Sequence, residues 1–257
     1  MIKHSGHQFA AIIPARYASS RFPGKPLVML GDKSMIQRVY EQASRSVDLV
    51  YVATDDQRIM DTVGKFGGKA VLTSTEHFSG TDRCAEAVER IMNETGQKID
   101  IVLNIQGDEP FIQPEQINLL KSCFNDETVQ IATLVRKTDP GEDIFDPNHV
   151  KVILDTRGNA IYFSRAAIPF YRGLEAEKWS EQHAYFKHLG LYAYKTGTLK
   201  TITKLARGLL EIAESLEQNR WLENGLKIRT AVTELESISI DTPEDLERAL
   251  RYLNDFV

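Results

Sequence analysis

Residues 9–27 read FAAIIPARYASSRFPGKPL, and this stretch decides the expected architecture. Its first five residues form an apolar run that ends at Pro14, and a charged loop follows directly. Short, continuous apolar runs are typical of strands that are buried on both faces of a sheet. We therefore predict a core strand that carries a polar loop at its carboxyl end.

Three similar apolar runs follow along the chain, at residues 49–53, 70–72 and 99–105. Between the runs, apolar residues recur at the spacing of amphipathic helices, as Met35 and Val39 do. Strand alternates with helix four times, which favours a doubly wound α/β fold with a mostly parallel, Rossmann-like sheet.

The pattern changes after about residue 139. Two short strand patterns flank the turn sequence TRGN at residues 156–159, which predicts a β-hairpin. Later strands and helices are expected at residues 189–194, 197–207, 212–224, 227–232 and 238–240, with a last helix capped by Thr242. We predict one domain over residues 1–257 with a hairpin-containing insertion at about 140–200.

The composition excludes several classes of protein. The 257 residues include 31 Lys and Arg against 36 Asp and Glu, a formal net charge of −5 that argues against a nucleic-acid partner. No apolar run approaches the roughly 18 residues that span a bilayer, so no membrane association is expected. Cys84 and Cys123 form no CxxC pair and are expected to be buried apolar side chains. These features predict a soluble, cytoplasmic protein.

The first loop has the chemistry of an anion site. Arg16, Arg21 and Lys25 lie within ten residues, beside two serines. Arg offers a bidentate fork to phosphate oxygens and Lys a point charge, and ligands of open α/β sheets bind beyond the carboxyl ends of strands. The loop matches neither the GxGxxG dinucleotide motif nor the GxxxxGK[ST] phosphate loop, because Pro26 follows Lys25. Judged alone, a solvated surface loop remains the alternative.

Two aspartates stand where predicted strands end. Asp108 follows Gly107 after the fourth strand, and Asp241 follows the last strand. Mg²⁺ binds hard oxygen ligands, usually one or two carboxylates with phosphate and water. The residues alone leave Asp108 open as a turn residue, Asp241 as a helix cap and residues 79–83 as an ordinary helix start.

Taken together, these segments resemble the sugar nucleotidyltransferases, and among them the branch that couples CTP to 3-deoxy-manno-octulosonate (Kdo). The matching segments cover nearly the full length, at residues 13–27, 52–56, 79–83, 104–110, 150–169, 188–192, 216–218 and 241–248. The first loop alone indicates only a nucleotidyltransferase. Ser20 and Phe22 stand where the family often has Thr and Leu, and Phe170 where Trp is common; Ser20 keeps the hydroxyl.

The resemblance implies a nucleotide site and a metal site. CTP is expected to contact the residues that match the nucleotide pocket of the family: Ala15, Arg16, Ser20, Arg21, Lys25, Ser79, Gly80, Thr81, Arg83, Gln106 and Asp108. Family members hold Mg²⁺ with acids at the positions of Asp108 and Asp241. The catalytic residues are then Arg16, Lys25, Asp108 and Asp241, which neutralise phosphate charge directly or through the metal.

The resemblance also implies a sugar-acid site. Family members contact the carboxylate and hydroxyls of Kdo from the positions of Arg165, His188, Tyr192, Glu217 and Gln218. Without the resemblance, Arg165 would be a surface charge, His188 a core histidine and Glu217 a solvated helix residue. The period of two along a strand places His188 and Tyr192 on one face.

The implied reaction transfers CMP from CTP to Kdo and releases pyrophosphate, which activates Kdo for lipopolysaccharide synthesis. Two alternatives stay open: a cytidylyltransferase for another acid sugar, such as a sialic acid or an amino analogue of Kdo, and a nucleotide-binding module without catalysis. Related enzymes are homodimers through the insertion, whose alternating apolar residues leave faces to cover, so a homodimer is expected.

Overall fold

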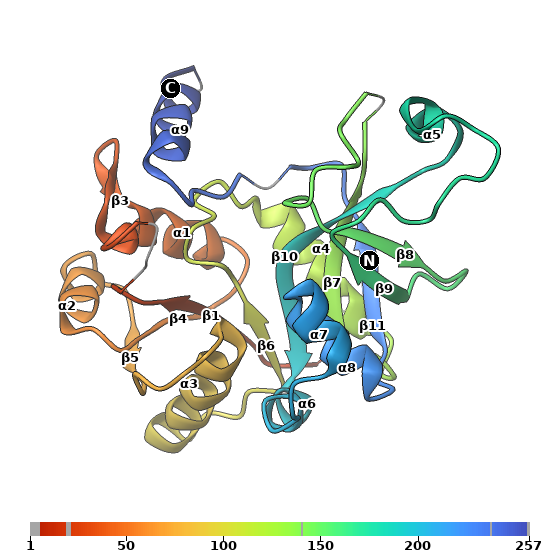
Figure 1. Cartoon of the computed structure of the whole chain (residues 1–257). Coiled ribbons are helices and arrows are strands. Elements are labelled where there is room, and N and C mark those ends of the chain that lie inside the picture. Colours follow the sequence, from red (N-terminus) through yellow and green to blue (C-terminus); the bar gives the residue numbers. More distant parts are fainter. Residues whose placement is uncertain (1–5, 19–21, 140, 237, 256–257) are drawn as a thin grey trace. The chain divides into compact units, whose positions relative to one another are not determined.

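The computed structural model describes residues 6–18, 22–139, 141–236 and 238–255 (Figure 1). The chain divides into two compact units. Unit 1 comprises Met1–Asn118, Ala193–Thr203 and Ser237–Val257, and unit 2 comprises Leu119–Tyr192 and Lys204–Glu236. Most of the insertion predicted at 140–200 belongs to unit 2, and its roles in sugar binding and dimerisation stay predictions.

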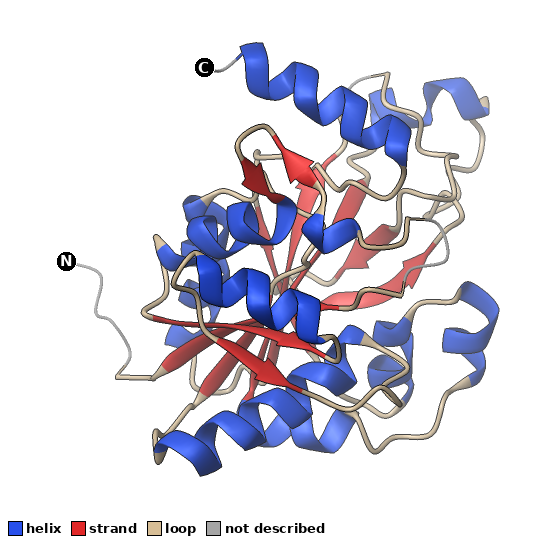
Figure 2. Ribbon diagram, turned by 90° about the vertical axis from the view of Figure 1, so that its left-hand side faces the viewer, coloured by secondary structure: helices blue, strands red, loops and turns tan. Residues whose placement is uncertain are grey.

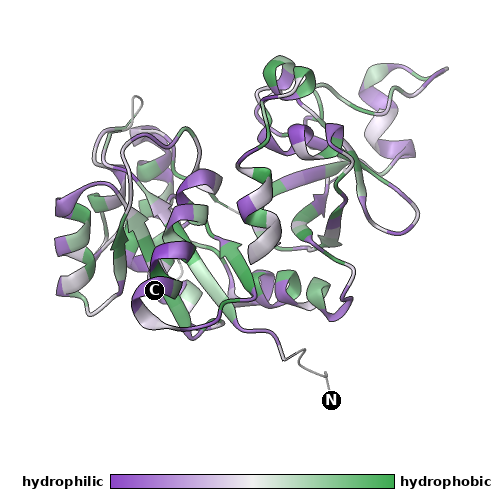
Figure 3. Cartoon of the chain, turned by 90° about the horizontal axis from the view of Figure 1, so that it is seen from below, coloured by the Kyte–Doolittle hydropathy of each residue, from purple (hydrophilic) through white to green (hydrophobic). Residues whose placement is uncertain are grey.

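Unit 1 contains a parallel sheet with the strand order β6-β1-β4-β5. Its strands are β1 (Phe9–Ala15), β4 (Leu49–Thr54), β5 (Ala70–Leu72) and β6 (Ile101–Asn104). Every residue of β4 and β6 is buried, as are most of β1, because helices cover both faces. These strands are green in Figure 3, which marks hydrophobic residues. The predicted doubly wound, parallel arrangement is confirmed.

The winding of this sheet reverses beside β1. The helices α1 (Met35–Ser44) and α2 (Gln57–Lys65) connect β1 to β4 and β4 to β5, and α3 (Gly80–Thr95) then returns the chain to β6 on the other side of β1. Because parallel crossovers are right-handed, α1 and α2 cover one face of the sheet and α3 the other (Figures 1 and 2). Ligands of doubly wound sheets bind at such a reversal, here between β1 and β6.

The last helix, α9 (Pro243–Asp255), also belongs to unit 1. The Thr242 hydroxyl accepts a hydrogen bond from the Asp245 amide, and the Asp245 carboxylate accepts bonds from the amides of Asp241 and Thr242. Thr242 therefore caps the helix as predicted, but residues 238–240 form no strand. The remaining elements of unit 1 are η1 (Lys25–Leu27), β2 (Met29–Leu30), β3 (Lys33–Ser34) and α6 (Thr196–Ile202).

Unit 2 has its own strands, in the order β11-β7-β10, with β8 beside β10 and β9 beside β8. They are β7 (Ile131–Lys137), β8 (Lys151–Leu154), β9 (Ala160–Ser164), β10 (Phe186–Lys195) and β11 (Ile228–Val232), and the last three residues of β10 belong to unit 1. The antiparallel pair β8–β9 is the predicted hairpin, with Gly158 at a φ of 76° in its turn.

The helix expected at 212–224 is two helices in the structure, α7 (Leu209–Glu214) and α8 (Glu217–Glu223). Ser215 breaks the run, because its φ of 53° lies in the left-handed region that a continuous helix does not use. The other helices are α4 (Pro114–Ser122), which begins in unit 1, and η2 (Cys123–Asn125), η3 (Ala176–Lys178) and α5 (Trp179–Gln182). Among the described residues, no helix has the length and apolar character needed to cross a bilayer.

Candidate active site

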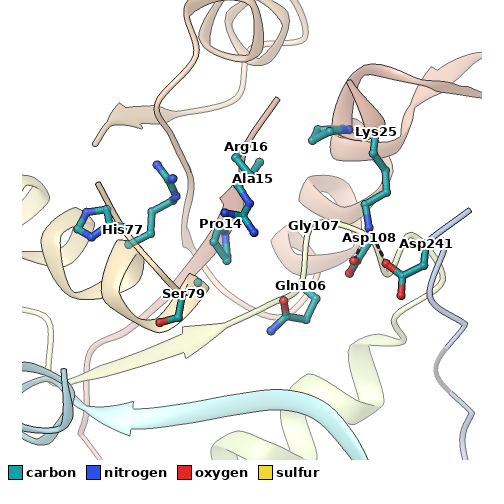
Figure 4. A pocket seen from close by; sticks show the side chains of 13 residues that line it. Pro14, Ala15, Arg16, Lys25, His77, Ser79, Gln106, Gly107, Asp108 and Asp241 are labelled. Atoms are coloured by element: carbon teal, nitrogen blue, oxygen red, sulfur yellow. Dashed lines mark hydrogen bonds and ion pairs between the residues drawn. The ribbon is translucent and has the colours of Figure 1, made fainter. Parts of the chain in front are cut away.

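A pocket of about 250 Å³ lies in unit 1 at the carboxyl ends of β1 and β6, where the winding reverses (Figure 4). It is lined by Pro14, Ala15, Arg16, Lys25, Pro26, His77, Ser79, Gly80, Arg83, Gln106, Gly107, Asp108 and Asp241. Nine of these residues were predicted from the sequence. Thr81 is buried in the first turn of α3 instead, and Ser20 and Arg21 lie outside the described residues.

The centre of the pocket is an ionic cluster of three residues. The Lys25 ammonium donates to Asp108 Oδ2 at 2.6 Å and to Asp241 Oδ1 at 3.0 Å (Figure 4). The Ile240 amide donates to the Asp108 carbonyl at 2.9 Å, which fastens the segment before α9 to the loop after β6. Two aspartates that are 133 positions apart in the sequence therefore meet at one cation.

Gly107 explains why Asp108 can reach this position. A Cβ at Gly107 would lie 2.9 Å from the carbonyl oxygen of Pro14, closer than real Cβ atoms approach backbone. Only glycine lets the loop after β6 lie against the end of β1. The small residue before Asp108 is thus a condition for the shape of the site.

Lys25 is presented by a tight loop. Gly24 has a φ of 72°, and its amide donates to the Tyr17 carbonyl at 2.9 Å, so the chain returns toward β1. The Leu27 amide donates to the Gly24 carbonyl at 2.8 Å and closes the turn of η1. The left-handed conformation is one that glycine adopts without strain. The backbone that carries Lys25 is therefore fixed, while its side chain keeps four rotatable bonds.

Ser79 and Gly80 form the start of α3. The Ser79 hydroxyl accepts from the Asp82 amide, and the Asp82 carboxylate accepts from the Ser79 amide, which is a complete capping box. The sixteen-residue helix directs its amino terminus toward the pocket, where the macrodipole favours negative charge. The helix-start interpretation and the binding interpretation of residues 79–83 are therefore compatible.

Arg83 lines the pocket, but its donors are largely engaged by the protein. It donates to Thr73 Oγ1 at 2.6 Å, to the Ser74 carbonyl at 3.3 Å and to Asp55 Oδ2 at 2.8 Å, and the residue is 3% exposed. The guanidinium ties α3 to the loop after β5. This geometry favours a positioning role over direct contact with a ligand.

His77 also lines the pocket and was not predicted from the sequence. Its Nε2 forms a short contact with Glu86, which also accepts from the Ser74 amide at 2.9 Å. Burial alone would raise the pKa of Glu86, but the bonds from Ser74, His77 and Arg90 lower it below its usual value. The anionic Glu86 therefore orients the His77 ring in the pocket wall. In the sequence, only the position of His77 two residues before Ser79 indicated that it could lie in the pocket.

The chemistry of the cluster fits a hard divalent cation. Oxygens of Asp108 and Asp241 both lie within hydrogen-bond distance of a single point, the Lys25 nitrogen. No group of three or more His, Cys, Asp or Glu side chains with metal-site geometry occurs among the residues that the structure describes. Mg²⁺ commonly uses one or two carboxylates and completes its shell with phosphate and water, so the pair suffices.

The residues predicted for the sugar acid all lie in unit 2. Arg165 follows β9; its Nε donates to the Glu214 carbonyl at 2.8 Å and its Nη1 to the Pro147 carbonyl at 3.0 Å. The Glu214 carboxylate in turn accepts from Tyr162, Ser164 and the Arg165 amide. These bonds hold the guanidinium in one orientation.

His188 and Tyr192 lie on the same side of β10, as predicted, with ring centroids 5.2 Å apart. Burial lowers the pKa of His188 to about 3, so the ring is neutral at physiological pH. Thr133 Oγ1 lies 2.7 Å from the Leu191 carbonyl, 3.2 Å from the Leu189 carbonyl and 3.0 Å from His188 Nε2, and a hydroxyl that gives its one proton to a carbonyl accepts from a protonated Nε2. In that tautomer the Nδ1 atom is an acceptor.

Glu217 and Gln218 begin α8. Glu217 Oε1 accepts from Arg220 at 2.7 Å, and Gln218 is 6% exposed. The amide side chain of Asn219 donates to the Phe163 carbonyl at 2.9 Å and accepts from the Phe163 amide, which attaches α8 to β9. These bonds join α8, which carries Glu217 and Gln218, to β9, which Arg165 follows, and the rings of Tyr192 and Trp221 join β10 to α8.

The cytidylyltransferase family model matches residues 10–228. The chain belongs to the cytidylyltransferase family. It is 55% identical to the 3-deoxy-manno-octulosonate cytidylyltransferase of Bacteroides thetaiotaomicron, over 96% of this chain and 99% of that protein. The protein of the same name from Thermodesulfovibrio yellowstonii is 49% identical, over 95% and 98% of the two chains. The resemblance that the sequence motifs indicated is confirmed.

Solved structures agree with this family. A structure of CMP:2-keto-3-deoxy-manno-octonic acid synthetase complexed with CTP is 39% identical, with a TM-score of 0.88 over 97% of this chain and all of that chain. A cytidylyltransferase from Leptospira borgpetersenii, at 18% identity and a TM-score of 0.63, shares the fold alone, over 98% of this chain and 88% of that one.

Proposed function

We propose that the protein transfers CMP from CTP to Kdo and releases pyrophosphate. The observation that carries the proposal is the convergence of Asp108 and Asp241 on Lys25 at the reversal between β1 and β6. The names of relatives that are about half identical, and the related synthetase that was solved with CTP, support the choice of both substrates.

The bond that forms joins the anomeric oxygen of Kdo to the α-phosphorus of CTP, and the bond to the bridging oxygen of pyrophosphate breaks; the proton of the anomeric hydroxyl passes to solvent. Such phosphoryl-type transfer needs positioning and charge stabilisation rather than covalent chemistry from the protein. Arg16 and Lys25 would neutralise phosphate oxygens, with Arg21 as a third cation. Ser79, Gly80 and Gln106 would surround the cytidine, with Ala15 beneath it and Arg83 holding the wall in place.

Mg²⁺ belongs to the proposal as the cofactor. Asp108 and Asp241 would hold it, and when bound it would offset the charge of the phosphate oxygens and favour the ionised form of the attacking hydroxyl. The fit of two hard carboxylates at one point supports this assignment.

For the acid sugar, we propose the five residues of unit 2. The oriented guanidinium of Arg165 suits a carboxylate, and the Nδ1 acceptor of neutral His188 suits a sugar hydroxyl. Tyr192, Glu217 and Gln218 would complete the contacts with hydroxyl groups.

The decisive experiment is a pyrophosphate-release assay with CTP, Mg²⁺ and one acid sugar at a time. We expect turnover with Kdo that exceeds turnover with a sialic acid or an amino analogue of Kdo, and little turnover when GTP or ATP replaces CTP. A sialic acid or the amino analogue as the best substrate would establish the first alternative. Binding of CTP without turnover of any sugar would establish the nucleotide-binding module.

A cytoplasmic homodimer that serves lipopolysaccharide synthesis completes the proposal. Phe163, Leu189, Leu191 and Tyr194 of the insertion are buried within the chain, whereas Ile161 is 55% exposed. Exposed apolar residues of this kind are candidates for a subunit interface. Sedimentation of the wild type should give twice the 29.1 kDa of one chain. Ile161→Glu should lower the measured mass toward the 29.1 kDa of a single chain. A wild-type protein of 29.1 kDa at micromolar concentration would refute the dimer.

A further inference from the structure

One ammonium group satisfies two carboxylates at the centre of the pocket. The Lys25 side chain is 14% exposed, and those of Asp108 and Asp241 are 26% and 37% exposed. The three groups together carry a charge of −1, so the lysine offsets half of the negative charge of the pair. Without it, two negatively charged groups would face each other and repel.

A divalent cation would need the same oxygen atoms. Mg²⁺ holds carboxylate oxygens at about 2.0–2.1 Å. The Lys25 nitrogen is already 2.6 Å from one of these oxygens and 3.0 Å from the other. Two cations at nearly one point repel each other strongly in a partly buried site. The ammonium and the metal therefore exclude each other from the space between the two aspartates.

We propose that Lys25 and the divalent cation are alternative partners of Asp108 and Asp241, and that the phosphates of the nucleotide receive the lysine when the metal takes its place. The inference rests on the proposed function, which supplies the metal and the nucleotide. When the Lys25 ammonium moves from the two carboxylates to phosphate oxygens, it exchanges one anionic partner for another. Metal and nucleotide then strengthen each other's binding by the same factor, as linkage requires.

The local structure suits an exchange of this kind. The turn from Gly24 to Leu27 fixes the backbone, so the movement is confined to the flexible side chain of Lys25. The bond from the Ile240 amide to the Asp108 carbonyl holds the two acidic segments together independently of the lysine. The carboxylates therefore remain paired when Lys25 departs.

A purely structural lysine makes the opposite prediction. If Lys25 only tied the two segments together, its removal would separate the carboxylates and weaken metal binding. If it competes with the metal, its removal strengthens metal binding in the absence of nucleotide. The sign of the change therefore decides between the two roles.

The test measures Mn²⁺ binding to the full chain, after EDTA treatment and dialysis, from the electron paramagnetic resonance signal of free Mn²⁺. Lys25→Met should bind Mn²⁺ about tenfold more tightly than wild type. This factor corresponds to a free energy of roughly 1.4 kcal/mol, which the metal must otherwise supply to displace the lysine. Lys33→Met is the matched control, because Lys33 also pairs with one carboxylate, that of Glu41 at 2.7 Å, and its loss changes the net charge equally. The control should stay within about twofold of wild type.

A non-reactive CTP analogue with a methylene group between the α- and β-phosphorus provides the second arm. It should tighten Mn²⁺ binding to wild type by more than about tenfold, and tighten it less in Lys25→Met, where no lysine remains to be moved. Unchanged or weaker Mn²⁺ binding by Lys25→Met without nucleotide would overturn the exchange.

Failure of the exchange and failure of the proposed function give different results. If Asp108→Asn abolishes Mn²⁺ binding while Lys25→Met leaves it unchanged, the metal site stands and only the exchange is refuted. If Asp108→Asn has no effect, the metal lies elsewhere, and both the exchange and the two-aspartate metal site are refuted; failure of the proposed function is recognised separately, by the absence of pyrophosphate release from CTP and Kdo. Thermal melting in EDTA checks that the variants are folded. Lys25→Met should have a lower melting temperature than wild type, and the double variant Lys25→Met with Asp108→Asn should regain part of that decrease. Lys25→Gln serves as the second variant.

Discussion

The Ile240 amide donates to the carbonyl of Asp108 at 2.9 Å, and this single backbone bond joins the two ends of the site. Asp108 follows β6 and Asp241 precedes α9, so neither carboxylate can reach the other through its own element. A backbone bond therefore holds the two acidic segments together in addition to the bonds of the Lys25 side chain. Substitutions that disturb this backbone should therefore lower activity strongly even when they add only one or two atoms.

Gly107→Ala tests that backbone directly. The added Cβ would meet the Pro14 carbonyl at 2.9 Å, so the loop must move and carry Asp108 away from Asp241. We expect kcat to fall about 10²-fold, as displacements near 1 Å do, and stability to fall by about 1–3 kcal/mol. Gly64→Ala, at an exposed position of α2 where a Cβ would meet nothing within 4 Å, should instead stabilise by about 0.5–1 kcal/mol. Normal turnover of Gly107→Ala would contradict the close-approach argument.

Arg83→Lys tests the positioning role of Arg83. Lysine cannot reproduce the fork that reaches Thr73, Ser74 and Asp55, so stability should fall by about 2 kcal/mol and KM for CTP should rise through the loosened wall. Arg90→Lys on the same helix, at a side chain that is 48% exposed, should change stability by less than about 0.5 kcal/mol. Thermal melting and steady-state kinetics measure both variants. A stable Arg83→Lys with only KM changed would indicate direct ligand contact.

Glu214→Gln tests an acid-sensitive contact in unit 2. Burial alone would raise the pKa of Glu214, but bonds from Arg165, Ser164 and Tyr162 lower it below its ordinary 4.5. A lowered folded-state pKa adds stability above the ordinary value, which is lost as the pH falls below about 4.5. The variant should therefore lose about 1–2 kcal/mol at pH 7 and show a flatter acid limb in urea unfolding. The exposed Glu177→Gln should reproduce the wild-type curve; a steeper limb for Glu214→Gln would be the wrong sign.

His188→Asn tests a separate pH window. Because burial lowers the folded-state pKa of His188 to about 3, the unfolded chain binds one more proton than the folded chain between that value and about 6.5. Stability therefore falls as the pH drops through this range, by about 1–2 kcal/mol between pH 7 and pH 5 for this group. The variant should lack that slope. Nitrogen NMR of the wild-type ring should detect a neutral His188 at pH 5; a charged ring there would contradict the burial argument.

The fold of unit 1 was predictable because its strands are buried on both faces. Continuous apolar runs at β1, β4, β5 and β6 leave few other interpretations, and the reversal beside β1 then follows from the order of the elements. In unit 2, β7 was not predicted, and the break at Ser215 was missed, since a non-glycine residue at positive φ has no marker in the sequence. The division of the chain into two units was not foreseen either.

The site was predictable mainly from the resemblance, because, of its three central residues, only Asp108 follows a strand; Lys25 lies in η1, and residues 238–240, directly before Asp241, form no strand. Asp108, Lys25 and Asp241 were assigned from position and resemblance, and the structure brings them together. The sequence could not show that the guanidinium of Arg83 donates its hydrogen bonds to protein groups, because its partners Thr73 and Asp55 lie in other loops. His77 was missed for the same reason, since Glu86 orients it from the far side of a turn.

Unit 1 is built from three separate stretches of the sequence, and this affects the order in which the protein can fold during synthesis. All of unit 2 lies between stretches of unit 1 in the sequence, and the last stretch of unit 1 carries Asp241 and α9. On the ribosome, the segments of unit 2 therefore emerge before unit 1 can be completed. The acidic pair can assemble only after Asp241 has emerged, so a chain that stalls or is clipped before Asp241 lacks the pair. Asp241 is therefore the last residue of the pocket lining to emerge during synthesis, and the proposed metal site is completed after the rest of the pocket.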